Sequence, residues 1–199
     1  RVLHGAQREP GLMVSSVHAL RITAKDDGRL GRWTCQEGPR GPGRRTHPPR
    51  SSRTSYNGPV SDAPKKILFV CTGNICRSAM AEILLRHWSG TRGLGLEVRS
   101  CGTAAESWYE VPDHARALLT AEGVATFTHR PSLLTREQLK WADLVLVMTR
   151  GHHGYVVDLY PEFTRRTRLL REHAGFGELD VDDPMGRTRE VFAACLGVI

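Results

Sequence analysis

The stretch KKILFVCTGNICRSAMAEILLRHW, residues 65–88, decides the fold. It opens with the wholly apolar run Ile67–Val70, which is typical of a strand buried on both faces of a sheet. A polar loop with a glycine follows, and apolar residues then recur at helical spacing, at Met80, Ile83, Leu84 and Trp88. A buried strand, a loop and an amphipathic helix in this order predict the first unit of a parallel α/β sheet.

Strands and helices alternate along the rest of the chain. Short apolar runs predict further strands at Leu96–Arg99, Leu144–Met148 and Arg168–Leu170. Helix start and stop signals predict helices between Pro112 and Gly123, from the capping-box pair Thr135 and Gln138 to Trp141, over His152–Leu159, and from Arg187 onward. We expect the last helix to be truncated.

Ligands bind beyond the carboxyl ends of the strands in a parallel sheet. The loops after Val70 and Met148 are therefore expected on the functional edge, together with the loop Asp180–Gly186.

Charge divides the chain into two parts. Residues 1–64 hold 11 Lys and Arg against 5 Asp and Glu, whereas residues 65–199 hold 17 against 16. The first part lacks apolar periodicity, and Gly38–Arg53 consists mostly of Gly, Pro, Arg and Ser, so we expect a disordered basic tail. It lacks the interleaved aromatic residues of a nucleic-acid-binding arm, and no nucleic-acid partner is expected. Residues 65–199 are expected to form one domain.

The composition also bears on location. No apolar run approaches the ~18 residues of a membrane span, and the first residues lack the apolar stretch of a signal peptide. The five cysteines, an odd number at irregular spacing, do not suggest a secreted disulfide framework. We therefore expect a cytoplasmic protein, a monomer, with no membrane partner.

The loop Cys71–Ser78 has the features of a phosphate cradle. Cys71 and Arg77 flank five residues, and the loop leads directly into the predicted helix. Backbone N–H groups of such a loop and the positive end of the helix can converge on one anion. The Arg77 guanidinium matches two phosphate oxygens. Gly73 would permit close backbone approach, and Asn74 would tolerate a left-handed conformation.

In this electropositive setting Cys71 is expected to be a thiolate that attacks phosphorus and forms a cysteinyl-phosphate. Ser78 could donate a hydrogen bond to the sulfur and ease its departure. The alternative is a structural or zinc-binding pair of Cys71 and Cys76, but zinc needs two more ligands. No second cysteine pair is present, and the adjacent His152 and His153 are poorly placed to ligate jointly. No metal is therefore predicted.

Phosphate transfer also needs an acid that protonates the leaving group. The candidate is Asp183, in the segment Asp182–Gly186, where Pro184 stiffens the loop. An Asp-Pro pair alone is a common turn former. Its occurrence in the same chain as the cysteine loop makes Asp183 the candidate general acid.

Four segments together resemble one known family. CTGNICRS, residues 71–78, is similar to a signature loop, and DPMG, residues 183–186, is similar to an acid loop. SCGT, residues 100–103, and HRPSLLTREQLKWADLVLVMTRGH, residues 129–152, match two segments between them. On these motifs the chain, over Lys65–Ile199, resembles the low-molecular-weight protein-tyrosine phosphatase family.

The resemblance implies a four-stranded parallel sheet between helices, in a flavodoxin-like three-layer arrangement, without metal or organic cofactor. It implies that Cys71 is the nucleophile, Arg77 the phosphate clamp and Asp183 the general acid. Cys76 would form a reversible disulfide with Cys71. The residues implied to bind phosphate or substrate, or to shape the loop, are Thr72, Gly73, Asn74, Ile75, Cys76, Ser78, Ser100 and the aromatic pair Trp108 and Tyr109.

Three activities remain open, each on its own substrate. The leading hypothesis is hydrolysis of phosphotyrosine in a phosphorylated protein. The alternative is a protein-arginine phosphatase, a bacterial branch of the same family that shares the DP-x-G loop and the VMTRGH segment but typically has Thr where this chain has Ile75. An arsenate reductase would need a relay of nearby cysteines, and Cys101 and Cys195 do not form such a pair in the sequence.

Overall fold

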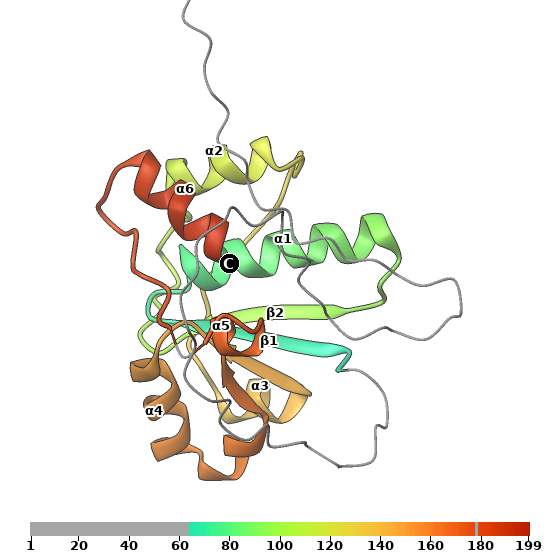
Figure 1. The fold of residues 1–199 in the computed structure, drawn as a ribbon, viewed down its shortest axis with the longest axis vertical. Helices are drawn as coiled ribbons and strands as arrows, with labels where there is room; N and C mark the ends of the chain where they lie inside the picture. Colours follow the sequence, from blue (N-terminus) through green and yellow to red (C-terminus); the bar gives the residue numbers. More distant parts are fainter. Residues whose placement is uncertain (1–63, 178) are drawn as a thin grey trace, which may run out of the picture. The chain divides into compact units, whose positions relative to one another are not determined.

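The computed structural model describes residues 64–177 and 179–199. Nearly all of the expected basic tail, residues 1–63, lies outside the described residues. Figure 1 shows the arrangement of the helices and strands.

The described residues contain one four-stranded sheet in the order β2-β1-β3-β4. Each neighbouring pair of strands is parallel. The strands are β1 (Lys66–Cys71), β2 (Glu97–Gly102), β3 (Leu144–Val147) and β4 (Thr167–Leu169). The predicted α/β class and the four-stranded parallel sheet are confirmed.

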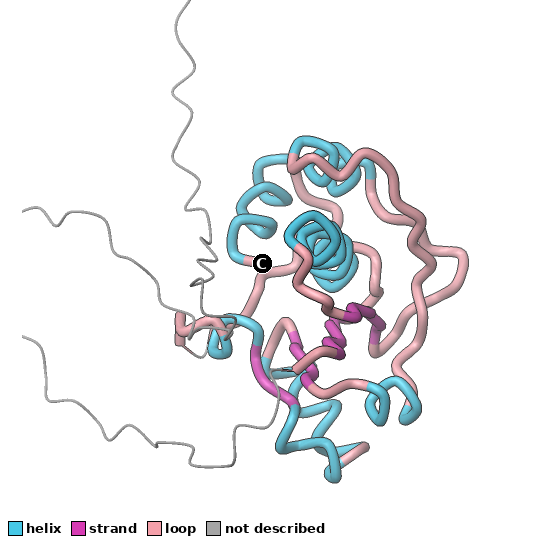
Figure 2. Tube along the Cα trace, turned by 90° about the vertical axis from the view of Figure 1, so that its right-hand side faces the viewer, coloured by secondary structure: helices cyan, strands magenta, loops and turns pink. Residues whose placement is uncertain are grey.

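Helices cover both faces of the sheet, as Figures 1 and 2 show. The helices α1, α2 and α6 pack on one face, and α3, α4 and the 3-10 helix η1 lie on the other. The bounds are α1 (Arg77–Arg92), α2 (Asp113–Ala121), α3 (Arg136–Trp141), α4 (Arg150–Leu159), η1 (Pro161–Arg166), α5 (Leu170–His173) and α6 (Arg189–Val198). This is the predicted three-layer arrangement. Among the described residues, no helix is both long enough and apolar enough to cross a membrane.

The apolar run in β1 explains why this strand lies inside the sheet. Ile67 and Phe69 belong to the core cluster under α1, α2 and α6. Leu68 and Val70 point the other way, into the cluster beneath α3, α4 and η1. Successive side chains of a strand alternate between faces, so a strand covered on both sides must be apolar at every position.

Helix ends follow local signals. The capping box is confirmed, since Thr135 Oγ1 accepts a hydrogen bond from the Gln138 N–H and Gln138 Oε1 accepts one from the Thr135 N–H. Helix α4 begins at Arg150, two residues before the predicted start, because Thr149 is its N-cap. The short helix α5 was not predicted, because its four residues are too few to show a helical period.

The functional edge forms where β1 and β3 end. The Val181 N–H donates to the Met148 carbonyl at 2.8 Å, which fixes the segment before Asp183 beside the end of β3. The expectation that three loops meet at this edge is confirmed.

Candidate active site

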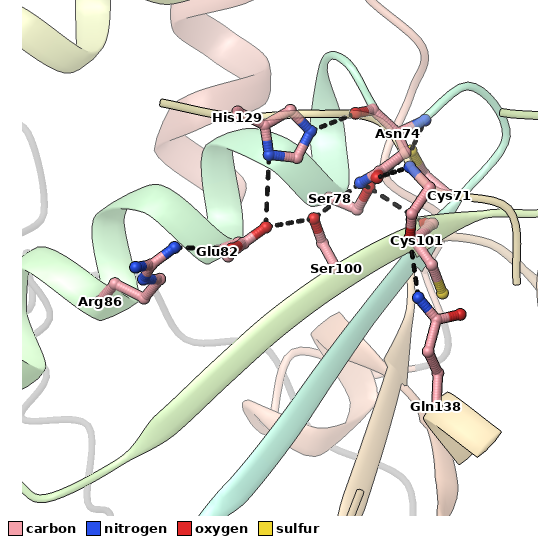
Figure 3. Close-up of polar contacts among 10 residues, drawn as sticks. Cys71, Asn74, Ser78, Glu82, Arg86, Ser100, Cys101, His129 and Gln138 are labelled. Atoms are coloured by element: carbon pink, nitrogen blue, oxygen red, sulfur yellow. Dashed lines mark hydrogen bonds and ion pairs between the residues drawn. The ribbon is translucent and has the colours of Figure 1, made fainter. Parts of the chain in front are cut away.

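The cysteine loop, residues 71–78, connects β1 to α1 and is held by Asn74. Within the described residues, Asn74 is the one non-glycine residue with a positive φ, 56°. Asn and Asp enter this left-handed region more readily than other L-residues, which agrees with the sequence prediction. The buried Asn74 amide donates to Ser78 Oγ at 3.0 Å and to Ser100 Oγ at 2.7 Å, and it accepts from the Ser132 N–H at 2.9 Å. Figure 3 shows the contacts of Asn74 with Ser78 and Ser100.

The sulfur of Cys71 lies at the end of β1 with 2% of the residue exposed. The Asn74 N–H donates to it at 3.3 Å, and Ser78 Oγ lies 2.9 Å away. Ser78 Oγ accepts from the Asn74 amide, and its own proton can point to the Cys71 sulfur or to the Cys101 carbonyl oxygen 3.4 Å away. The Asn74 N–H and the Ser78 hydroxyl are thus the hydrogen-bonding neighbours of the sulfur.

Two segments of the protein backbone approach each other closely at Gly102. A Cβ on Gly102 would lie 2.2 Å from the Thr72 carbonyl oxygen and 3.0 Å from the Asn74 nitrogen. A Cβ on Gly73 would meet its neighbours at 3.6 Å or more, which is ordinary contact. The expectation for Gly73 concerns the approach of an anion to the loop backbone and stays a prediction. The end of β2 packs so tightly under the cysteine loop that only glycine fits there.

Arg77 is the first residue of α1, and its side chain is 6% exposed. Its Nη2 donates to Asp183 Oδ2 at 2.5 Å, and its Nη1 donates to the Val181 carbonyl at 3.3 Å. Among the described residues, no partner accepts a hydrogen bond from its buried Nε. A buried, unpaired guanidinium N–H costs free energy, and an oxyanion beside it would remove that cost.

Asp183 reaches the cysteine loop from the segment before α6. Its side chain is half exposed, and its Oδ1 accepts from the Met185 N–H at 3.1 Å. The structure thus brings Asp183 to Arg77, at the helix end that also carries the loop of Cys71. The three side chains that the sequence assigned to catalysis lie in one place.

The predicted aromatic pair lies at the rim of this loop. Trp108 is 72% exposed and meets Tyr109 edge to face, with 6.0 Å between ring centroids. Tyr109 Cδ2 and the Ile75 side chain both come within 4.0 Å of the space beside Gly73. Ile75 is buried. An apolar side chain and an aromatic ring therefore border the cysteine loop on one side.

A buried carboxylate supports the loop from below, and sequence reasoning missed it. Glu82 Oε2 accepts from Ser100 Oγ at 2.5 Å and lies 3.4 Å from His129 Nδ1, as Figure 3 shows. His129 Nε2 lies 2.7 Å from the Asn74 carbonyl oxygen, so its N–H donates there. Burial opposes charge on Glu82, but hydrogen bonds from His129 and Ser100 outweigh it and hold the pKa of Glu82 below its usual range. The available signal was an acidic residue inside the apolar run of α1.

The four cysteines of the described part are free and buried. Burial raises the pKa of Cys76 and of Cys195 to about 12, and burial also raises that of Cys101. These three thiols remain protonated at neutral pH. Within residues 64–177 and 179–199, no group of three or more His, Cys, Asp or Glu side chains could hold a metal ion.

A parallel α/β sheet whose first strand leads into a Cys-x5-Arg loop defines a class of protein phosphatases. The sequence model described as "Low molecular weight phosphotyrosine protein phosphatase" matches residues 66–199. The chain belongs to this family of hydrolases.

Relatives with two different names match the chain. A "Protein-arginine-phosphatase" of Geobacillus stearothermophilus is 40% identical over 131 residues, covering 66% of this chain and 86% of the relative. A "Low molecular weight protein-tyrosine phosphatase A" of Mycobacterium tuberculosis (strain ATCC 25618 / H37Rv) is 35% identical over 142 residues, covering 68% and 85%.

Solved structures agree with the family. The "YwlE arginine phosphatase from Geobacillus stearothermophilus" has a TM-score of 0.62 at 39% identity, covering 67% of this chain and 84% of that one. A "Low Molecular Weight Protein Tyrosine Phosphatase from T. tengcongensis" has a TM-score of 0.62 at 37% identity, covering 66% and 89%.

Proposed function

We propose that this protein hydrolyses phosphorylated proteins through a cysteinyl-phosphate intermediate. One observation carries the proposal. Arg77, with an N–H that lacks a partner among the described residues, contacts Asp183 at the helix end that carries the Cys71 loop. A nucleophile, an anion clamp and an acid are the three groups that transfer of a phosphoryl group to a side chain requires.

In the first step, the Cys71 sulfur attacks phosphorus and the bond from phosphorus to the leaving group breaks. Once the phosphoryl group has replaced Asp183 on Arg77, the Asp183 carboxyl group carries a proton and gives it to the departing atom. The Arg77 guanidinium binds two phosphoryl oxygens as a fork. Because Arg77 pairs with Asp183 in the structure, an incoming phosphoryl group competes with that carboxylate for the guanidinium.

In the second step, water attacks phosphorus and the sulfur–phosphorus bond breaks. Asp183, now ionised, takes the proton of the water. The sulfur leaves as an anion, which the Asn74 N–H and the Ser78 hydroxyl stabilise. The products are inorganic phosphate and the enzyme in its starting state.

We propose phosphotyrosine as the preferred substrate. Ile75 and Tyr109 provide an apolar border beside the loop, which suits the flat face of a phenyl ring. The exposed Trp108 extends this border outward. Phosphoarginine is the second candidate, because relatives at 40% and 36% identity are named protein-arginine phosphatases.

The free thiols in the described part support a reducing compartment such as the cytoplasm.

A matched pair of variants tests the substrate. Ile75→Thr and Ile75→Val have the same branched shape and differ by a hydroxyl in place of a methyl group. With phosphotyrosine and phosphoarginine peptides of one sequence, the wild type and Ile75→Val should show the higher kcat/KM for phosphotyrosine. Ile75→Thr should shift the ratio toward phosphoarginine. A wild type that prefers phosphoarginine would overturn the tyrosine assignment. A Cys71→Ser variant that still releases phosphate would overturn the mechanism.

A further inference from the structure

His152 occupies a buried position beside the cysteine loop that the mechanism above does not use. Its Nε2 lies 2.9 Å from Thr72 Oγ1, and its Nδ1 lies 2.8 Å from Thr149 Oγ1. Thr72 follows the nucleophile directly, and Thr149 is the N-cap of α4. The imidazole therefore connects the start of α4 to the cysteine loop, between hydroxyl groups that are 77 positions apart in the chain.

A neutral ring donates from one nitrogen and accepts at the other, so one of the two threonine hydroxyl protons is always left without a ring partner. Thr149 Oγ1 accepts from the His152 backbone N–H at 3.2 Å, so its own proton is free to reach Nδ1. We assign the acceptor role to Nδ1 and the ring proton to Nε2, because the opposite arrangement would leave the free hydroxyl proton on the half-buried Thr149 and not on the exposed Thr72. The Nε2–H donates to Thr72 Oγ1, which leaves the hydroxyl proton of the exposed Thr72 side chain free.

The surroundings keep this ring neutral. Burial and the nearby Arg77 charge lower the pKa of His152 to about 4, although Asp183 and Asp180 act in the opposite direction. The His152 ring therefore stays neutral at pH values around 7 and keeps one nitrogen as donor and the other as acceptor.

We propose that His152 is a positioning residue that holds Thr72 with its hydroxyl proton available to a phosphoryl oxygen or to the leaving group of the substrate. The inference rests on the proposed phosphatase function. His152 acts through Thr72 and touches no reacting atom. Thr72 supplies one more hydrogen-bond donor next to the nucleophile, at a place where charge develops during phosphoryl transfer.

Two replacements of His152 separate positioning from a general structural role. In His152→Asn the amide can occupy the place of Nδ1 and keep the contact with Thr149, but it is too short to reach Thr72. In His152→Gln the longer amide can occupy the place of Nε2 and donate to Thr72. We expect His152→Asn to lower kcat/KM for a phosphotyrosine peptide by about fivefold to tenfold, the effect of one hydrogen bond. His152→Gln should recover most of that loss.

Thr72→Val removes the hydroxyl from an exposed side chain and should cause a similar loss. The double variant His152→Asn/Thr72→Val should be no worse than either single variant, since both remove the same contact. His153→Asn, on the adjacent histidine, is the control and should match the wild type. The inference would be overturned if the two single losses in kcat/KM multiplied in the double variant. It would also be overturned if His152→Asn left kcat/KM unchanged.

Nitrogen NMR of the imidazole gives a second readout that does not depend on turnover. At pH 7 the His152 ring should carry its proton on Nε2, and a proton on Nδ1 would overturn the inference. An inactive wild type would instead reject the phosphatase function, and the NMR result would still decide the hydrogen-bond arrangement.

Discussion

Arg77 and Asp183, 106 positions apart in the chain, form an ion pair with 2.5 Å between Nη2 and Oδ2. The pair links the first turn of α1 to the segment before α6. The pair joins a buried guanidinium to a carboxylate whose side chain is half exposed. Its importance is geometric, since it places a carboxyl group at the mouth of the cysteine loop.

Asp183→Asn should remove the proton donor without changing the shape of the side chain. We expect kcat for an aryl phosphate with a poor leaving group to fall by about a hundredfold or more, and much less for a good leaving group that needs no proton. Steady-state rates with a series of substituted phenyl phosphates measure this. Asp182→Asn, on the adjacent exposed residue, is the matched control. Equal losses for good and poor leaving groups would reject Asp183 as the acid.

Selective alkylation should identify the reactive thiol. Iodoacetamide reacts with thiolates, and the raised pKa values of Cys76 and Cys195, each about 12, keep those two protonated at neutral pH. Of the four cysteines in the described residues, Cys71 should therefore be alkylated first at pH 7, as measured by peptide mass mapping. Inorganic phosphate should slow this alkylation. First labelling at Cys76 would contradict the assignment of the nucleophile.

Gly102→Ala should damage both stability and activity. The added methyl group would lie 2.2 Å from the Thr72 carbonyl oxygen, so the end of β2 and the cysteine loop must separate. We expect a loss of about 2 kcal/mol or more in the free energy of unfolding, measured with urea, together with a loss of turnover. Gly90→Ala, in α1 with open space around it, should instead be neutral or stabilising by up to about 1 kcal/mol. Equal stability of the two variants would refute the tight packing at Gly102.

Glu82→Gln should change how stability depends on pH. Because the folded protein holds the pKa of Glu82 below its ordinary value of 4.5, the carboxylate stabilises the fold above that pH. This contribution is lost as the pH falls below 4.5 toward the lower folded value. The wild type should exceed the variant by about 2 kcal/mol at pH 7, and the difference should shrink under acid. Urea unfolding at several pH values measures it, with the exposed Glu122→Gln as control. A difference that is constant with pH would contradict the role of the carboxylate.

The backbone of the site could be predicted from the sequence because its signals are local. The run Ile67–Val70, the glycine-containing loop and the helical spacing after Ser78 lie next to one another in the chain. The capping box at Thr135 and the left-handed residue Asn74 also depend on nearby residues only.

The hydrogen bonds and close packing that hold the cysteine loop in place could not be predicted in the same way, because they join segments that are far apart in the chain. His129 reaches Asn74 across 55 positions and His152 reaches Thr72 across 80. Neither histidine belongs to a motif whose spacing reveals its partner. Gly102 was overlooked because the need for glycine comes from another segment of backbone above it, and Gly73 has no such neighbour.

The Nε–H of Arg77, which has no hydrogen-bond partner within residues 64–177 and 179–199, also has a practical consequence for handling the protein. We expect phosphate or sulfate in a buffer to supply an acceptor for this donor and so to raise the melting temperature, as a ligand that binds only the folded state does. Under the proposed function, the same anion would compete with the substrate and slow turnover. Storage conditions that best preserve the protein are therefore the conditions in which its activity is hardest to observe.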